Sequence, residues 1–264
     1  MFSKARVSAI VLEHLLRLRH SFEEIVDTFY WPVMDIIIWG FMTTYFYRLG
    51  GATAAVISFL LGGLILWTIA WRSQQDIAVS LLWDVWNKNL TNLFATPLTP
   101  WEFLLGVIIL GAIKITLTVF LVFIIALVFY SFNLLTLGIY FLPFFANLLF
   151  FGWVVGIFVT ALILRFGMSI QNFAWGFIVL LQPVAAVYYP VSTLPLPLQY
   201  IARILPPSYI FEGMRQILGG SGLSLPYLFW ASFLNFVYLI FALLFFSFMF
   251  EKAREKGKLV KLEE

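Results

Sequence analysis

The sequence predicts an all-α integral membrane protein with six membrane-spanning helices. Hydrophobic residues make up 62% of the 264-residue chain and charged residues only 11%, and the mean hydropathy is +0.99. Soluble domains carry roughly 25% charged residues, so the composition excludes that class. Long apolar runs, each near the ~20 residues that a helix needs to cross a bilayer, alternate with short polar intervals. We therefore expect a single transmembrane domain over residues 1–264, without a separate soluble catalytic domain.

Residues 3–28 are predicted to form an amphipathic helix in the membrane interface. Apolar residues such as Val7, Ile10 and Leu15 recur at steps of three and four, and charged residues occupy the remaining positions. This spacing gives one apolar and one charged face. Charges interrupt the segment too often for a signal peptide. A helix packed on a soluble partner is the alternative.

The membrane spans are predicted from the apolar runs and the turn residues between them. Pro32 marks the bend at which the interface helix enters the bilayer. The glycines at 50, 51 and 167 mark tight turns. The predicted spans are residues 30–48, 53–72, 103–130, 142–164, 170–189 and 226–250, followed by a solvated tail over 251–264.

Two ionisable residues, Asp35 and Lys114, fall inside predicted spans. A charge at the bilayer centre costs about 2.5–3.5 kcal/mol on insertion scales, so such residues pair or face water. Asp35 lies near the entry end of its span, where an interfacial charge or a partner of the helix N-terminus is the plainer interpretation. Lys114 is expected to pair with Asp35 or Glu102, and a direct substrate contact is the alternative.

Gly152 and Gly156 lie four residues apart in the fourth predicted span. Small residues at this spacing let two helices approach closely inside lipid, so they predict a packing face. The motif alone is weak, because glycine is common in membrane helices.

Prolines break the apolar stretch between the fifth and sixth predicted spans, so it cannot form one straight helix. We expect two short helices there, with Pro206 between them and Glu212 and Arg215 three residues apart on the second. Short apolar helices of this kind are typical of a re-entrant hairpin, which needs protein or water around it. Residues 190–220 are predicted to form such a hairpin, facing outward.

The most conspicuous polar interval, residues 81–100, separates the second and third predicted spans. Its apolar residues recur at helical spacing, and Pro97 and Pro100 end the pattern. The interval predicts a short amphipathic helix at the membrane surface on which a partner protein can push, and a connecting loop on the headgroups is the alternative. The candidate contact residues are Asp84, Asn87, Lys88, Leu90, Asn92, Phe94, Thr96 and Pro97.

Positive charges predict the orientation of the chain. Six spans place both termini on one side, and we expect that side to be cytoplasmic because it collects most of the cations. We therefore expect a multi-pass protein of the plasma (inner) membrane, surrounded by lipids, with both termini and the interval 81–100 in the cytoplasm. The inner set is Lys4, Arg6, Arg17, Arg19, Arg72, Lys88, Arg165, Lys252, Arg254, Lys256, Lys258 and Lys261, and the outer set is Arg48, Arg203 and Arg215.

The sequence lacks the motifs of several chemistries. It contains no cysteine, no G-x-x-x-x-G-K-[ST] phosphate loop, no H-E-x-x-H and no G-x-S-x-G, and its two histidines, His14 and His20, form no ligand pattern. We expect no catalytic, cofactor-binding or metal-binding residues and no nucleic-acid partner. An ATP-independent secondary carrier or an intramembrane lipid-modifying enzyme stays open as an alternative, although a carrier usually has more buried ionisable residues.

Three stretches resemble the permease subunits of ABC transporters of the type-2 exporter class. They are NLFATPLTPWEFLLG over residues 92–106, WPVMDIIIWG over 31–40 and LPPSYIFEGMR over 205–215. The first is similar to the family's cytoplasmic loop, the second to the start of its first span and the third to its hairpin before the last span. Their order extends the resemblance over nearly the whole chain.

The resemblance implies a permease that dimerises, here expected as a homodimer, and pairs with two separate ATPase subunits that hold the ATP and Mg²⁺. Residues 84–97 would be the coupling helix that fits a cleft on the ATPase, the N-terminal helix would help to hold it, and the hairpin would cap the path. The chain departs from the family at residues 83–88, where the family's loop is richer in charge. Drugs, lipids, lipid-linked oligosaccharides and polysaccharides stay open as substrates, with a slight preference for a glycan or lipid-linked substrate.

Overall fold

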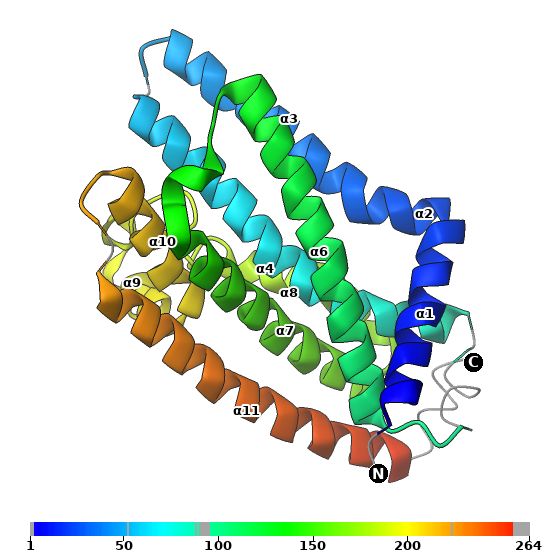
Figure 1. Cartoon of the computed structure of the whole chain (residues 1–264). Coiled ribbons are helices and arrows are strands. Elements are labelled where there is room, and N and C mark those ends of the chain that lie inside the picture. The colour runs from blue at the N-terminus through cyan, green and yellow to red at the C-terminus, as the bar shows by residue number, and fades with distance from the viewer. Residues whose placement is uncertain (1–2, 52, 88, 90–95, 223, 256–264) are drawn as a thin grey trace.

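The computed structural model describes residues 3–51, 53–87, 89, 96–222 and 224–255. Within these residues the regular elements are all helical (Figure 1). The all-α membrane class is therefore confirmed, but the described residues contain five helices, not six, that are long and apolar enough to cross a membrane. These helices are Phe22–Arg48, Ala55–Trp86, Pro100–Tyr130, Leu134–Phe166 and Leu225–Glu255.

The N-terminal region differs from the single helix predicted over residues 3–28. Helix α1 (Lys4–His20) ends at Ser21, whose backbone is extended with φ −101° and ψ 104°. The Ser21 side chain then accepts a hydrogen bond from the Glu24 N–H and caps the next helix. That helix runs through α2 (Phe22–Ile25) and η1 (Val26–Tyr30) into α3 (Trp31–Arg48) without a break. Residues 22–28 therefore belong to the first long helix.

Helix α4 (Ala54–Trp86) is much longer than the span predicted over residues 53–72. Its 33 residues extend over about 50 Å, well beyond the ~30 Å of the bilayer core. No glycine or proline occurs between Gly63 and Asn87, so nothing in the sequence stops the helix at Arg72. The first six residues of the interval 81–100 are thus the last turns of α4.

Helices α6 (Pro100–Tyr130), α7 (Phe141–Phe166) and α11 (Leu225–Glu255) agree with the spans predicted over 103–130, 142–164 and 226–250 and extend them by a few residues. A capping box between Thr99 and Glu102 begins α6. The short η2 (Leu134–Tyr140) leads into α7. The start of the predicted tail, residues 251–255, continues α11, and the rest of it lies outside the described residues.

The fifth predicted span, residues 170–189, is not one continuous helix. It contains η3 (Met168–Ile170) and α8 (Phe173–Leu181), and the nine residues of α8 extend over only about 13 Å. Pro183 has no N–H to continue the helix, and Ala186 has φ of 55°. The prediction that residues 170–189 form one membrane-spanning helix is therefore wrong.

The same segment nevertheless follows α4 in the antiparallel direction. The Ala174 carbonyl accepts a hydrogen bond from Gln74 at 3.0 Å. Farther along, the Val187 carbonyl approaches Gly63 so closely that an added Cβ would lie 2.7 Å from it. Gln74 and Gly63 are about 16 Å apart along the helix, so the segment from α8 onward returns the chain toward the end of the bundle where α3 joins α4.

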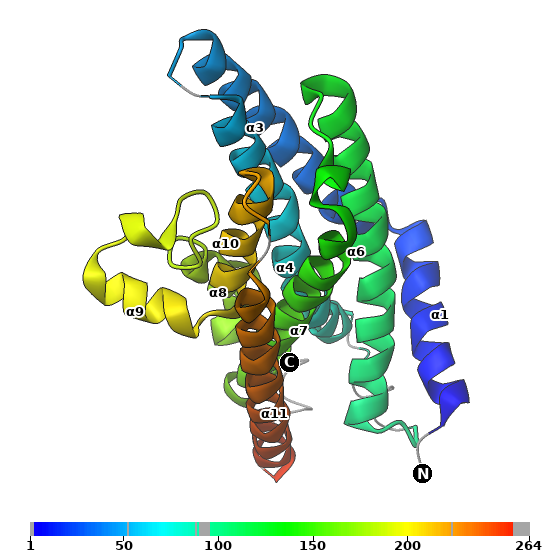
Figure 2. The same ribbon diagram turned by 60° about the vertical axis from the view of Figure 1, so that its left-hand side comes forward.

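Helix α4 is the central element, because it contacts α3, α6, α7, α8 and α10 (Figures 1 and 2). Its closest neighbour is α7, which places Gly152 and Gly156 against it. A Cβ at Gly152 would lie 2.5 Å from the Ala70 carbonyl oxygen, and one at Gly156 would lie 3.0 Å from that of Gln74. The two glycines thus lie where the backbones of α4 and α7 come together.

The stretch predicted as a hairpin contains η4 (Val191–Thr193), α9 (Leu196–Ile204) and α10 (Pro206–Leu218). Helix α10 packs against α4, α7 and α11, whereas α9 projects from the bundle in Figure 2. Two short helices thus lie in this stretch. Its re-entrant, outward placement stays a prediction.

Candidate functional site

Four of the predicted partner-binding residues are described by the structure, and they lie at one end of the bundle, from the last turn of α4 to the start of α6. Asp84 is in the last turn of α4 and is fully buried, which differs from its predicted place on an exposed surface. Asn87 directly follows α4 and is exposed, as are Thr96 and Pro97 just before α6. Lys88, Leu90, Asn92 and Phe94 lie outside the described residues.

Helix α1 packs along the beginning of α6 and buries Val7, Ile10 and His14. Gly106 on α6 makes room for it, because a Cβ at Gly106 would lie 2.6 Å from the Ile10 Cγ2 atom. Several leucines of α1 stay exposed on its other side, Leu12 by 55% among them. The helix therefore has one apolar face on the bundle and further apolar surface outside it, as a helix at a membrane surface requires.

An ion pair ties the start of α1 to the start of α6. The Arg6 Nη2 atom lies 2.7 Å from Oε1 of Glu102, whose side chain is fully buried. The same carboxylate accepts hydrogen bonds from the Ser3 N–H at 2.7 Å and from the Thr99 N–H at 2.9 Å. Glu102 therefore caps α6 and anchors α1 at once.

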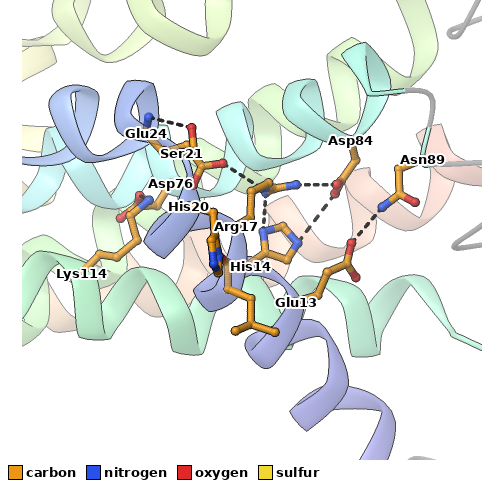
Figure 3. A network of polar contacts seen from close by, with 11 residues as sticks. Glu13, His14, Arg17, His20, Ser21, Glu24, Asp76, Asp84, Asn89 and Lys114 are labelled. Atoms are coloured by element: carbon orange, nitrogen blue, oxygen red, sulfur yellow. Dashed lines mark hydrogen bonds and ion pairs between the residues drawn. The ribbon is translucent and has the colours of Figure 1, made fainter.

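Arg17 ties the other end of α1 to α4 (Figure 3). Its guanidinium contacts Asp84 at 2.9 Å and Glu24 at 2.7 Å, and it donates to Nδ1 of His14 at 2.6 Å. Burial, followed by the charges of Arg17 and Lys114, lowers the pKa of His14 to about 3. The ring is therefore neutral at neutral pH, with its Nε2 proton toward Asp84 Oδ2, 3.8 Å away.

A third contact joins α1 to the polar interval itself. The Asn89 side chain donates a hydrogen bond of 2.9 Å to Glu13. We call the three pairs Arg6–Glu102, Arg17–Asp84 and Glu13–Asn89 the α1 clamp. The clamp holds α1 on both sides of residues 90–98, because one pair follows that stretch and two precede it.

Deeper in the bundle, Lys114 of α6 pairs with Asp76 of α4 at 2.6 Å, and both side chains are largely buried. The prediction that Lys114 pairs with Asp35 or Glu102 is wrong. The physical reason is the length of α4, which continues past Arg72 and places Asp76 beside α6.

The sequence contains a signal for this polar contact that the prediction missed. Arg72, Asp76, Ser80 and Asp84 recur at four-residue steps, and such residues share one face of a helix. Arg72 is also buried and lies 3.3 Å from Asp27. In one helix that continues to Trp86, this row of polar residues predicts acidic and basic partners on α1, α3 or α6.

The polar side chains of α1, α4 and α6 surround a small cavity of about 20 Å³, enough for one water molecule. In the parts of the chain that the structure describes, no group of three or more His, Cys, Asp or Glu residues could hold a metal ion. The charges here are matched to one another. The arrangement therefore fits a mechanical link between α1 and the bundle better than a site of bond-making chemistry.

Three of the predicted polar residues lie elsewhere. Asp35 is half-buried on α3 and takes part in none of the ion pairs among the described residues. On α10, Glu212 lies 3.3 Å from Arg215 and accepts from the Val191 N–H at 2.7 Å. Arg215 donates to the Ala186 carbonyl at 2.9 Å. Glu212 and Arg215 therefore hold the irregular segment before α9 against α10, whose first residue is Pro206.

We expect Arg6→Ala to loosen α1 without unfolding the bundle, because Glu102 loses its charged partner but keeps its cap contacts. A hydrogen bond to a charged group contributes about 1.5–3 kcal/mol. Amide hydrogen exchange in α1 should therefore accelerate roughly 10- to 100-fold, with exchange in α7 unchanged. Arg19→Ala, which removes an exposed arginine of the same helix, is the control and should have no effect. Equal exchange in the two variants would contradict an anchoring role for Arg6.

Comparison with protein families matches residues 17–218 to the model described as ABC-2 type transporter. No curated protein matches the chain. The match covers more than half of the sequence and includes the long helices from α3 to α7, the polar interval and the α9–α10 stretch. The chain therefore belongs to the ABC-2 type transporter family and is a multi-pass membrane permease component.

Proposed function

We propose that the chain is the membrane-spanning subunit of an ATP-driven exporter and that residues 87–99 bind a separate ATPase subunit. The observation that carries this proposal is the α1 clamp, which ties α1 to the chain on both sides of residues 90–98. A force on that segment reaches α4 and α6 directly, because it is continuous with both helices. It also reaches α1 through Glu13 and Asn89.

In this mechanism the ATPase supplies the free energy and the chain supplies the path. Closure of the nucleotide-bound ATPase pair displaces residues 87–99, and α4 and α6 move with them. The ion pairs of α4 support rigid-body movement over ion-coupled transport. A secondary carrier needs buried ionisable groups that can change partner or protonation, whereas Lys114 and Arg72 are already paired with Asp76 and Asp27.

The permease works as a homodimer in the plasma (inner) membrane, with its termini in the cytoplasm. The orientation is supported by the excess of cations on the proposed inner side. Dimerisation is supported by α3, which carries the half-buried Asp35 and exposes Phe41 and Tyr45 by 57% and 60%. A carboxylate facing lipid is unfavourable, so a second copy or a water-filled path covers that part of α3, and lipids cover the remaining apolar surface.

Reconstitution in lipid vesicles tests the proposal. Export should require both the chain and its ATPase, and transport by the chain alone would contradict the ATP-driven mechanism. We further expect Leu90→Asp and Phe94→Asp to reduce export sharply, because aspartate disrupts the apolar face predicted for the coupling segment. Both residues lie outside the described residues, so this prediction rests on sequence spacing.

Measuring ATP hydrolysis and substrate export on the same variants distinguishes a loss of coupling from a loss of folding. ATP hydrolysis by the assembled complex should continue in the Leu90→Asp and Phe94→Asp variants while substrate export falls at least about tenfold, equal to 1.4 kcal/mol of lost coupling. Leu135→Asp is a matched control, because Leu135 is 67% exposed in η2 at the other end of the bundle. Normal export by both coupling variants would exclude residues 87–99 as the ATPase contact.

A further inference from the structure

An apolar cavity lies between α3 and α4, near the turn that joins them. Its volume is about 130 Å³. In both ribbon views that turn lies at the end of the bundle away from the N-terminus, so the cavity is separate from the proposed ATPase contact (Figures 1 and 2). Its main walls are Trp39, Met42 and Phe46 of α3 and Leu60, Leu61 and Leu64 of α4.

The two polar side chains in the wall are hydrogen-bonded to protein neighbours. The Thr43 hydroxyl donates to the Gly40 carbonyl at 2.8 Å. The Tyr188 hydroxyl accepts from the Gln182 side chain at 3.0 Å. No charged residue of the described chain lines the cavity. Water is poorly held in such a space, and an apolar cavity of roughly 150 Å³ in another protein stays dry and binds benzene, so this wall selects a hydrocarbon.

The cavity lies at the depth that the acyl chains of one leaflet occupy. Arg48 ends α3 and is exposed, so we place it at the water interface on this side of the membrane. Phe46 is two residues before it and Trp39 is nine, which puts this wall roughly 3–14 Å from Arg48 along the helix. One leaflet contributes half of the ~30 Å hydrocarbon core and therefore covers the same range of depth.

The wall on α3 is continuous with the outer surface of that helix. Trp39, Met42 and Phe46 are each 46–47% exposed, so the same side chains line the cavity and face the surroundings of α3. Trp39 also stacks on Tyr188, with ring centroids 6.0 Å apart, and this pair lies at the end of the cavity farther from Arg48. A hydrocarbon chain beside α3 therefore meets the cavity from the membrane side.

The shape of the cavity favours a linear chain over a side chain of a second copy. From Trp39 to Phe46 the wall extends over about 10 Å, or two helical turns. A side chain that enters from a neighbouring helix crosses this direction and fills about one turn. Phe41 and Tyr45, the exposed residues that support dimerisation, are not part of the lining.

We propose that one acyl chain of a bilayer phospholipid is bound in this cavity as a resident part of the fold. The chain packs between α3 and α4 and fills the space that their side chains leave open. The lipid is not cargo, and it binds without nucleotide or ATPase. The proposal rests on the membrane location of the chain and is independent of the proposed ATP coupling.

Photolabelling in lipid vesicles, without any ATPase, tests the site. The purified full chain is reconstituted in dioleoyl phosphatidylcholine with a small fraction of a phosphatidylcholine whose acyl chain carries a diazirine, and peptide mass spectrometry locates the adducts. We expect adducts on Leu61 and Leu64, which are 0% and 6% exposed and which a lipid chain reaches through the cavity. Adducts on Leu244 of α11, which is 67% exposed, measure contact with the surrounding lipid.

Leu64→Trp places a larger side chain in the cavity. Labelling of Leu61 should then fall at least about tenfold, because displacing about two buried CH₂ groups already lowers affinity by that factor. Labelling of Leu244 should stay unchanged. Leu142→Trp makes the same change at a position that is exposed in α7 and is the matched control. Should Leu64→Trp fail to fold, Leu60→Phe decides, because it narrows the cavity by a smaller change.

Three results would overturn the proposal. The first is an absence of adducts on Leu61 and Leu64 while Leu244 is labelled. The second is labelling of Leu61 that neither Leu64→Trp nor Leu60→Phe reduces. The third is a disulfide between two copies of the Met42→Cys variant, since the chain has no other cysteine and a second copy would then occupy this face. Because no ATPase is present, none of these results bears on the coupling mechanism.

Discussion

Asp76→Ala is expected to destabilise the chain by about 3–5 kcal/mol, because it leaves the Lys114 ammonium buried without a counter-charge. The two groups are 2.6 Å apart, and their side chains are only 6% and 13% exposed. Gly111 on α6 allows this approach, since a Cβ there would lie 3.1 Å from the Asp76 Cβ. Lys114→Met should cost a similar amount by isolating the carboxylate.

The double variant Asp76→Ala/Lys114→Met distinguishes an ion pair from simple loss of packing. It should recover most of the stability lost in either single variant, because no buried charge remains. Thermal unfolding in one detergent, followed by tryptophan fluorescence, gives the four values of the cycle. The exposed pair Lys252–Glu255 is the control, and breaking it should cost well under 1 kcal/mol. Single variants as stable as the wild type would mean that Lys114 reaches solvent.

The class of the fold was predictable because hydropathy and helix length are tied to bilayer thickness. Three of the predicted spans, including 103–130 around Lys114, agree with long helices of the structure. The span 53–72 is too short because a charged residue is taken to mark the end of its helix. The predicted span 53–72 ends at Arg72, but a charge does not stop a helix when its partners are provided by neighbouring helices.

For a related reason, the sequence does not identify the partners of the polar residues. Asp84 and Arg17 are 67 residues apart, and the depth of a charge in a predicted span does not determine which helix is its neighbour. Asp84 was predicted as an exposed contact for the ATPase, whereas the structure buries it against α1. The four-residue stripe on α4 predicts that partners exist, and only the packing identifies them.

The fifth predicted span shows that an apolar stretch of sufficient length need not form one continuous helix. Residues 170–189 are apolar enough for a span, but Pro183 and the turn at Ala186 interrupt the helix. The segment is held instead by side chains, with Gln74 bound to the Ala174 carbonyl and Arg215 to that of Ala186. Inside a membrane, non-helical backbone requires such protein partners, and here they come from elements distant in the sequence.

Gly152→Ala is expected to force α4 and α7 apart, with a loss of roughly 1–3 kcal/mol or more. The added methyl group would meet the Ser73 Cβ atom and would lie 2.5 Å from the Ala70 carbonyl oxygen. A backbone oxygen cannot move aside as a flexible side chain can, so the helices must separate. Alanine is intrinsically favoured over glycine in a helix by about 1 kcal/mol, and this preference is too small to reverse the loss.

Gly176→Ala adds the same methyl group, but we do not expect it to lower the unfolding temperature. Gly176 lies in α8, where an added Cβ would meet nothing within 4 Å, so the helix preference of alanine acts alone. Thermal unfolding should therefore move down for Gly152→Ala and stay level or move up for Gly176→Ala. Gly156→Ala should fall between them, because its closest contacts are at 3.0 Å. Equal unfolding temperatures for the variants at 152 and 176 would mean that α4 and α7 do not meet at Gly152, and the central position of α4 would then lose its main support.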